Sequence, residues 1–98
     1  MTTHGLDQKT IVAIKSILKK NSKIKKILLY GSRAKGTYKN GSDIDLTLIA
    51  PELTTSDLLQ IETELEELML PYKIDLSLFH QIENNDVVEH IQRVGVKF

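Results

Sequence analysis

Apolar residues recur at helical spacing in three stretches of the chain. This periodicity predicts helices over residues 7–20, 57–70 and 86–94. We expect Asp7 to cap the first helix, and Asp57 with Gln60 to form a capping box at the start of the second. Pro71 and Gly95 follow the second and third helices and are residue types that stop a helix.

Three further stretches have the pattern of β-strands, over residues 24–30, 43–50 and 73–79. The first contains an unbroken apolar run, which favours a central strand buried on both faces. The other two alternate apolar and polar residues, so one face of each should meet the core. The intervening residues 31–42 are rich in Gly, Ser, Lys and Asn, and predict a single helical turn closed by Gly36.

The order of elements is helix, strand, turn, strand, helix, strand, helix. This order predicts an α+β fold, an α/β sandwich in which a small mixed β-sheet packs with helices. A length of 98 residues, with 41% hydrophobic and 27% charged residues, suits one globular domain over residues 1–98. Such a domain has no room for a second substrate-binding unit, so a large substrate would be met at the surface or supplied by a partner.

Composition narrows the class of protein. The chain has no cysteine, which excludes disulfides and thiolate metal sites, and its three histidines lack the spacing of a zinc site. It shows neither a run long enough to span a membrane nor the start of a signal peptide, so we expect no membrane association and a cytoplasmic location.

Charge is balanced overall but uneven along the chain. The net charge is zero, which argues against direct nucleic acid binding. Residues 1–40 carry ten Lys or Arg and one acid, whereas residues 41–98 carry three Lys or Arg and twelve acids, giving +9 and −9. A basic lobe for phosphates beside an acidic lobe for metal ions is one interpretation. Most of these charges are explained more simply as solvent-exposed faces of two helices that differ in the sign of their charge.

Two aspartates lie close together in the second predicted strand. Asp43 and Asp45 are two residues apart, so both carboxylates share one face, about 6.6 Å apart along the strand. Two carboxylates this close repel each other unless a cation lies between them, and hard oxygen ligands suit Mg²⁺ or Mn²⁺. Asp75 repeats the pattern in the third strand, and would complete a three-carboxylate cluster if that strand pairs with the second. Taken singly, each aspartate is more typical of an ordinary exposed strand position than of a metal site.

A glycine-containing loop precedes the aspartate pair. Gly31 and Ser32 follow the first strand directly; the glycine would let the backbone approach a phosphate, and the serine could donate its hydroxyl. Arg33 and Lys35 add charge for phosphate or are simply solvated. A plain turn and a plain helix cap explain Gly31 and Ser32 in isolation. Together with the carboxylate pair they favour nucleotide phosphate binding.

Gly31-Ser32, ten residues and then Asp43-Ile44-Asp45 form a GS-x10-D-x-D pattern. The pattern resembles the signature of the DNA polymerase β-like nucleotidyltransferase superfamily. The stretch GSRAKGTYKNGSDIDLTLI is similar to that of its minimal nucleotidyltransferases (MNT), and KIDLSLF resembles their third-aspartate strand. Lys35 departs from the family, where arginine is common; its charge is kept but bidentate phosphate binding would be lost.

The resemblance implies a magnesium-dependent enzyme that moves AMP from ATP to an acceptor hydroxyl. It implies two Mg²⁺ ions, with Mn²⁺ as the alternative, held by Asp43, Asp45 and Asp75, while Gly31, Ser32 and Arg33 bind the nucleotide phosphates. Proteins of this size resemble the antitoxin halves of two-gene modules paired with a helical HEPN-domain toxin. The acceptor implied is a tyrosine of that toxin.

Two other functions fit the sequence. In one, the protein is an inactive binding antitoxin that neutralises its partner by contact alone. In the other, it is a nucleotidyltransferase for a small molecule such as an aminoglycoside, which would need a second subunit to complete the acceptor pocket. Leu59, Met69 and Leu70 widen the apolar arc of the second helix and, with Phe98, allow for a homo-oligomer as well as for local packing.

Overall fold

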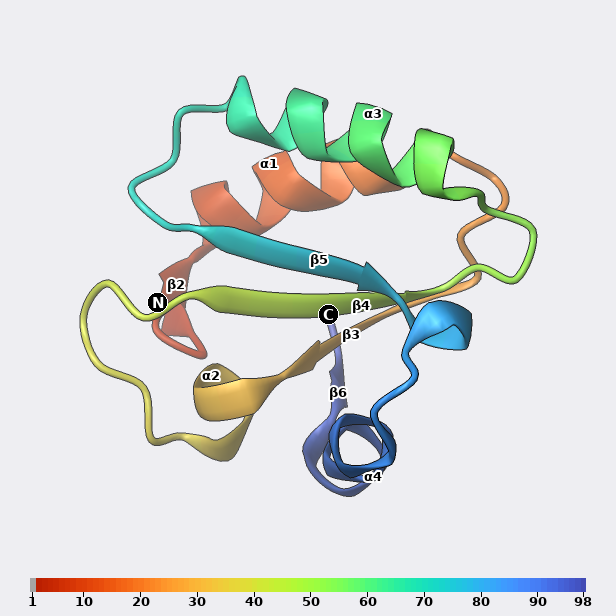
Figure 1. Cartoon of the computed structure of the whole chain (residues 1–98). Helices are drawn as coiled ribbons and strands as arrows, with labels where there is room; N and C mark the ends of the chain where they lie inside the picture. Colours follow the sequence, from red (N-terminus) through yellow and green to blue (C-terminus); the bar gives the residue numbers. More distant parts are fainter. Residues whose placement is uncertain (1) are drawn as a thin grey trace.

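A four-stranded mixed β-sheet forms the centre of the protein, as seen in a computed structural model that describes residues 2–98 (Figure 1). Its strands are β3 (Lys26–Tyr30), β4 (Ile44–Ile49), β5 (Ile74–Leu78) and β6 (Val96–Lys97), in the spatial order β5-β4-β3-β6. β4 and β5 are parallel, whereas β3 is antiparallel to both of its neighbours. The predicted α+β fold with a small mixed sheet is confirmed.

Helices cover both faces of this sheet. They are α1 (Gln8–Leu18), α2 (Gly31–Lys35), α3 (Thr55–Glu66) and α4 (Asn85–Val94), with a single 3₁₀ turn, η1 (Phe79–Gln81). α1 and α3 lie side by side over one face, and α2 and α4 lie at the other (Figure 1). α3 connects β4 to the parallel strand β5, as a crossover helix must. Within residues 2–98, no helix is long and apolar enough to cross a membrane.

The two faces of the sheet differ in chemistry. The face under α1 and α3 is aliphatic and almost completely buried, and its strand residues are Ile27, Leu29, Ile44, Leu46, Leu48, Leu76 and Leu78. Alternation puts the polar residues of the same strands on the opposite face, toward α2 and α4. One set of alternating strand residues therefore packs in the core, and the other set lies on the polar face, where a functional site can form.

A short hairpin precedes α1 and was not predicted. Its strands are β1 (Thr2–Thr3) and β2 (Leu6–Asp7), paired antiparallel. The turn is formed by His4 and Gly5, both with positive φ (56° and 76°), which is the backbone twist that a two-residue hairpin requires. The hairpin buries Leu6 completely against the core.

The ends of the helices correct two predictions. Asp7 caps α1 as expected, accepting a hydrogen bond from the Thr10 N–H at 2.8 Å. The capping box of α3 is instead formed by Thr54 and Asp57, so the pairing of Asp57 with Gln60 was wrong. α3 also ends at Glu66, before the predicted residue 70, and Met69 just beyond it adopts a left-handed conformation with φ 52°.

The C-terminal tail completes the sheet. Val96 and Lys97 form β6 beside β3, and the Phe98 N–H donates to the Ile27 carbonyl at 2.9 Å. The Phe98 side chain packs against the core of its own chain. Local packing therefore accounts for Phe98, while Leu59 and Met69 remain largely exposed.

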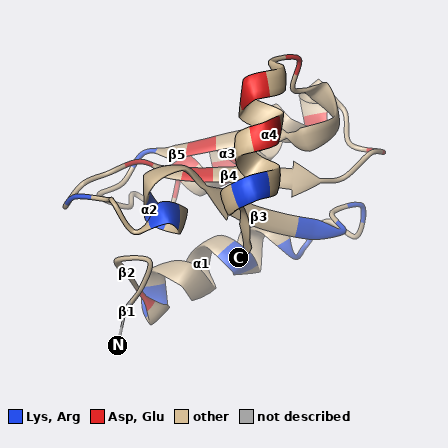
Figure 2. Ribbon diagram, turned by 90° about the horizontal axis from the view of Figure 1, so that it is seen from below, with Lys and Arg blue, Asp and Glu red and all other residues tan. Residues whose placement is uncertain are grey.

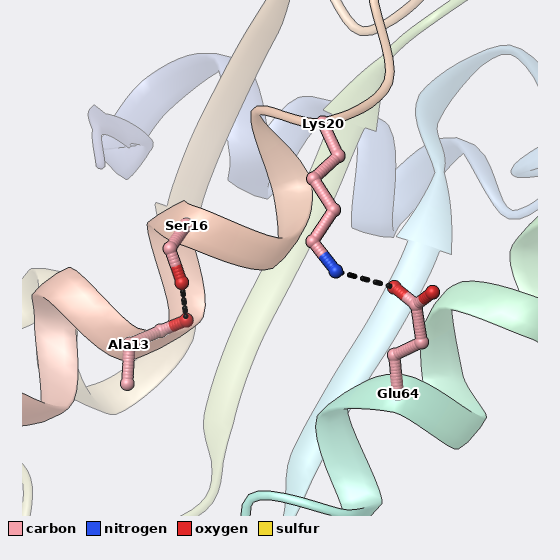
Figure 3. A network of polar contacts seen from close by, with 4 residues as sticks. All are labelled: Ala13, Ser16, Lys20 and Glu64. Carbon is pink, nitrogen blue, oxygen red and sulfur yellow. Dashed lines mark hydrogen bonds and ion pairs between the residues drawn. The ribbon is translucent and has the colours of Figure 1, made fainter.

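The contact between α1 and α3 is apolar at its centre and charged at its edge. Lys20, just after α1, pairs with Glu64 of α3 at 3.9 Å, and nearby the Ser16 hydroxyl donates to the Ala13 carbonyl (Figure 3). Both charged side chains are well exposed, and pairs of this kind contribute little to stability. The aliphatic face of the sheet, rather than this pair, stabilises the helix layer.

Replacing a central core leucine should therefore be costly. Leu29 is fully buried in β3, so Leu29→Ala should lower the free energy of unfolding by about 2–5 kcal/mol. The matched control is Leu59→Ala on α3, where the side chain is 59% exposed, and it should cost less than about 1 kcal/mol. Urea unfolding followed by circular dichroism measures both, and similar losses would contradict this assignment of the core.

Candidate active site

Three polar side chains lie in one row across the sheet, on the face opposite the aliphatic core. Strand register pairs Tyr30 of β3 with Asp45 of β4, and Asp45 with Asp75 of β5. The acidic positions of β4 and β5 consequently lie beside each other (Figure 2). The pairing of the second and third predicted strands, which the sequence left open as a condition for the carboxylate cluster, is present. Two carboxylates thus occupy neighbouring positions on one surface.

Asp43 lies at the edge of this surface. It comes directly before β4, is exposed, and has the same strand parity as Asp45. Within residues 2–98, no three acidic or histidine side chains converge tightly enough to hold one metal ion. The three aspartates are therefore neighbours on one face without being closed around a single point.

The electrostatics of the row reflect this concentration of negative charge. Partial burial raises the pKa of the Asp45 carboxyl, and the carboxylates of Asp75 and Asp43 raise it further. Burial also raises the pKa of the Tyr30 phenol, with smaller contributions in the same direction from Asp75 and Asp45. A divalent cation bound at these carboxylates would relieve their repulsion. The donor set consists of carboxylate oxygens, which Mg²⁺ and Mn²⁺ prefer.

Gly31 makes room beside Asp45. It begins α2 directly after β3, with φ 74°, and a side-chain carbon added there would overlap the Asp45 carboxylate. Only glycine fits both the conformation and the space. The backbone at the start of α2 can therefore lie directly against the carboxylate surface, as the sequence pattern predicted for a phosphate-binding turn.

His90 of α4 belongs to this surface and was missed by the sequence analysis. Its Nε2 accepts a hydrogen bond from the Gly31 N–H at 3.1 Å, and its ring meets the Tyr30 ring edge-on, with centroids 6.1 Å apart. An accepting Nε2 places the proton of the neutral imidazole on Nδ1. Histidine spacing gave no signal, because the partners of His90 are a backbone group and a ring 60 residues earlier in the chain.

Ser32 and Lys35 follow Gly31 on α2. Ser32 is half-buried, and its carbonyl accepts from the Thr37 N–H at 3.0 Å, which closes the short helix. Gly36 ends the helix in a left-handed conformation, as predicted. Lys35 is exposed. The serine is thus held next to the carboxylate surface, and the lysine is free to move in solvent.

Arg33 corrects the expectation of a free cation for phosphate. Only 2% of its surface is exposed. Its Nε and Nη2 donate to the Ser42 carbonyl at 3.2 and 2.8 Å, and its Nη1 donates to the His4 carbonyl at 2.9 Å. A guanidinium with these contacts binds the protein's own backbone, so it is unavailable to a ligand.

A model of a known protein family matches most of the chain. The family model described as "Polymerase beta, Nucleotidyltransferase" matches residues 13–98. No curated protein matches the chain.

Solved toxin–antitoxin complexes share the fold. One with AMP-PNP is 22% identical at a TM-score of 0.72, covering 94% of this chain and 72% of that one. An MntA–HepT complex is 19% identical at 0.69, covering 93% and 70%. A complex of tri-AMPylated Shewanella oneidensis HEPN toxin with MNT antitoxin is 17% identical at 0.62, covering 90% and 70%.

Two glycines allow the crowding at the site to be tested. Gly31→Ala and Gly36→Ala both place a side chain at positive φ (74° and 83°), but only the first would overlap Asp45, since the second faces open space. Gly36→Ala should cost about 1–2 kcal/mol of stability from backbone strain alone. Gly31→Ala should cost clearly more in urea unfolding. Equal costs would show that Asp45 does not crowd Gly31.

Charge repulsion at the row should also be visible in stability. The pKa of Asp45 is raised by folding from its ordinary value of 3.8, so the ionised carboxylate destabilises the fold. In EDTA at pH 7, Asp45→Asn should therefore raise the melting temperature by a few degrees. The difference should shrink as the pH falls through the folded pKa toward the ordinary value. Glu52→Gln, at an exposed turn position outside the helices and strands, is the control. A less stable Asp45→Asn at pH 7 would contradict the raised pKa.

Proposed function

Because the chain belongs to the polymerase β nucleotidyltransferase family, we propose that it transfers AMP from ATP to an acceptor hydroxyl. The observation that carries this proposal is the in-register pair of Asp45 and Asp75 beside the start of α2 at Gly31. Carboxylates for divalent cations and a backbone turn for phosphates are the two parts that this transfer needs. Both lie on the one face of the sheet that the core leaves polar.

Each residue has a role in this proposal. Asp43 and Asp45 hold two Mg²⁺ ions, with Mn²⁺ as the alternative, and Asp75 binds the second ion and helps to take the proton from the acceptor hydroxyl. Gly31 and Ser32 contact the β- and γ-phosphates, which leave as pyrophosphate. Bound cations would stabilise the attacking and leaving oxygens at the α-phosphorus.

The acceptor we propose is a tyrosine on a helical HEPN-type partner, so that the protein acts as an antitoxin. Similarity in fold to the MNT antitoxin that was solved with a tri-AMPylated HEPN toxin supports this choice of acceptor. Similarity to the toxin–antitoxin complex solved with AMP-PNP supports ATP as the donor. A protein acceptor would bring its own surface to the site, which suits a domain of this size.

Intact-mass measurement of the partner tests the proposal. The tagged protein is purified from its native host, and proteins that bind it are analysed in parallel for wild type, Asp43→Asn and the control Asp86→Asn. Wild type and the control should yield a partner with mass added in steps of one AMP. Asp43→Asn should reduce that addition at least about a hundredfold, the scale on which loss of a single transition-state contact acts.

The same experiment separates the alternatives. A partner that binds wild type and Asp43→Asn equally, with no added mass, would identify an antitoxin that works by contact alone. The absence of any partner would instead favour a small-molecule acceptor. Thermal shifts add a second readout, because Mg-ATP should raise the melting temperature of wild type but not of the Asp43→Asn, Asp45→Asn double variant.

A further inference from the structure

Arg33 carries a buried charge that the proposed chemistry does not use. Among residues 2–98 no carboxylate forms an ion pair with it, and the three hydrogen bonds that it donates go to backbone carbonyls. Its guanidinium also lies against the rings of Tyr38 and Tyr72, 5.3 and 5.0 Å from their centroids. Burying a charge is costly, and a well-packed apolar side chain would fill the space more cheaply. Stability alone therefore does not explain an arginine at this buried position, whereas the geometry of its hydrogen bonds can.

The contacts of Arg33 join three segments that are distant in sequence. The His4 carbonyl belongs to the N-terminal hairpin, Tyr72 precedes β5, and Ser42 lies in the loop between α2 and β4. A further contact holds the hairpin from the other side, where His4 Nδ1 lies 3.2 Å from the Arg33 carbonyl oxygen. Arg33 is thus the point where this loop meets the body of the protein.

The loop makes few other hydrogen bonds to the rest of the protein. Within residues 38–43, the other hydrogen bonds of the described chain are local, between Lys39 and Ser42. Gly41 has φ 81° with open space around it, and Tyr38 is itself 37% exposed. The two bonds from Arg33 to the Ser42 carbonyl hold the loop immediately before Asp43, and the bond from the Ile44 N–H to the Lys73 carbonyl at 2.9 Å holds the chain immediately after it.

Ser42 is bonded directly to Asp43. The carbonyl of Ser42 and the N–H of Asp43 share one rigid peptide plane, so two donors fixed on that carbonyl fix the plane from which Asp43 starts. The guanidinium fork can place two donors on one oxygen while a third reaches His4. A lysine ammonium, as a single point, cannot reproduce that arrangement.

We propose that Arg33 is a positioning residue that sets the Asp43 carboxylate relative to Asp45 through the Ser42 carbonyl. Arg33 touches no substrate. Its charge also acts on Asp45, but Arg33→Lys keeps that charge and changes the hydrogen-bond geometry at Ser42 and His4. This inference rests on the proposed function for the role of Asp43. It also explains how a carboxylate at an exposed loop end can be held for metal binding.

A double-mutant cycle in metal–nucleotide binding tests this role. Wild type, Arg33→Lys, Asp43→Asn and the double variant are titrated with the Mn²⁺ complex of a non-hydrolysable ATP analogue in a calorimeter. Arg33→Lys should weaken binding about 10–100-fold, as loss of an outer-shell partner of a metal ligand does. Because Arg33 acts through Asp43, adding Arg33→Lys to Asp43→Asn should cause no further loss. Additive losses would overturn the proposal.

Stability must be separated from positioning. Tyr38→Leu removes one ring beside the guanidinium and keeps its hydrogen bonds, so it should lower stability in urea and leave binding of the Mn²⁺ complex unchanged. If the loss of binding across these variants is proportional to their loss of stability, Arg33 has a purely structural role and the proposal is overturned.

A second pair of variants covers the case in which Arg33→Lys does not fold. Gly41→Ala strains the turn next to Ser42, whereas Gly36→Ala strains the start of the loop at a similar φ, and both positions face open space. Gly41→Ala should weaken binding of the Mn²⁺ complex more than Gly36→Ala does, and equal effects would count against the proposal. Wild type that binds the complex but modifies no partner would reject the proposed function alone. Wild type that does not bind it would reject both.

Discussion

The in-register parallel pairing of β4 with β5 is the interaction on which the rest of the structure depends. It places Asp45 opposite Asp75 and, in the same step, Leu46 opposite Leu76. A shift of one residue would turn the carboxylate of β5 toward the core and its leucines toward solvent. Packing of the aliphatic face under α1 and α3 therefore specifies the position of the carboxylates on the other face. The same strand register therefore determines both the packing of the core and the position of the carboxylates.

The site is held against its own electrostatics. Neighbouring carboxylates raise the pKa of Asp45, and no cation of the described chain forms an ion pair with them. The aliphatic face offsets that cost, because each fully buried leucine contributes about 1.5–3 kcal/mol. The charges of His90 and Arg33 offset only part of this effect on the pKa of Asp45, and the hydrogen bonds of Arg33 go to backbone carbonyls. The negative charge at this face is therefore only partly balanced within the described chain.

The sequence predicted those parts of the protein that residue type and period encode. The period of two in β4 and β5 put the aspartates on one face, and Gly31 carried the signal of a close backbone approach. Arg33 and His90 could not be assigned in this way, because their partners are the Ser42 carbonyl and the Gly31 N–H. Every residue except proline has both of these backbone groups, so they leave no mark in a sequence. Only the folded chain shows which of them a side chain reaches.

The return of the chain through α4 to β6 has a consequence for how the protein is made. β6 pairs with β3 through Leu28 and Lys97, and α4, just before it, brings His90 to Gly31. During synthesis the turn at Gly31 leaves the ribosome long before the residues that complete its surroundings, and contacts this distant in sequence form late. The surroundings of the turn at Gly31 are therefore completed only after translation has passed α4 and β6. A nascent chain would emerge without a finished site.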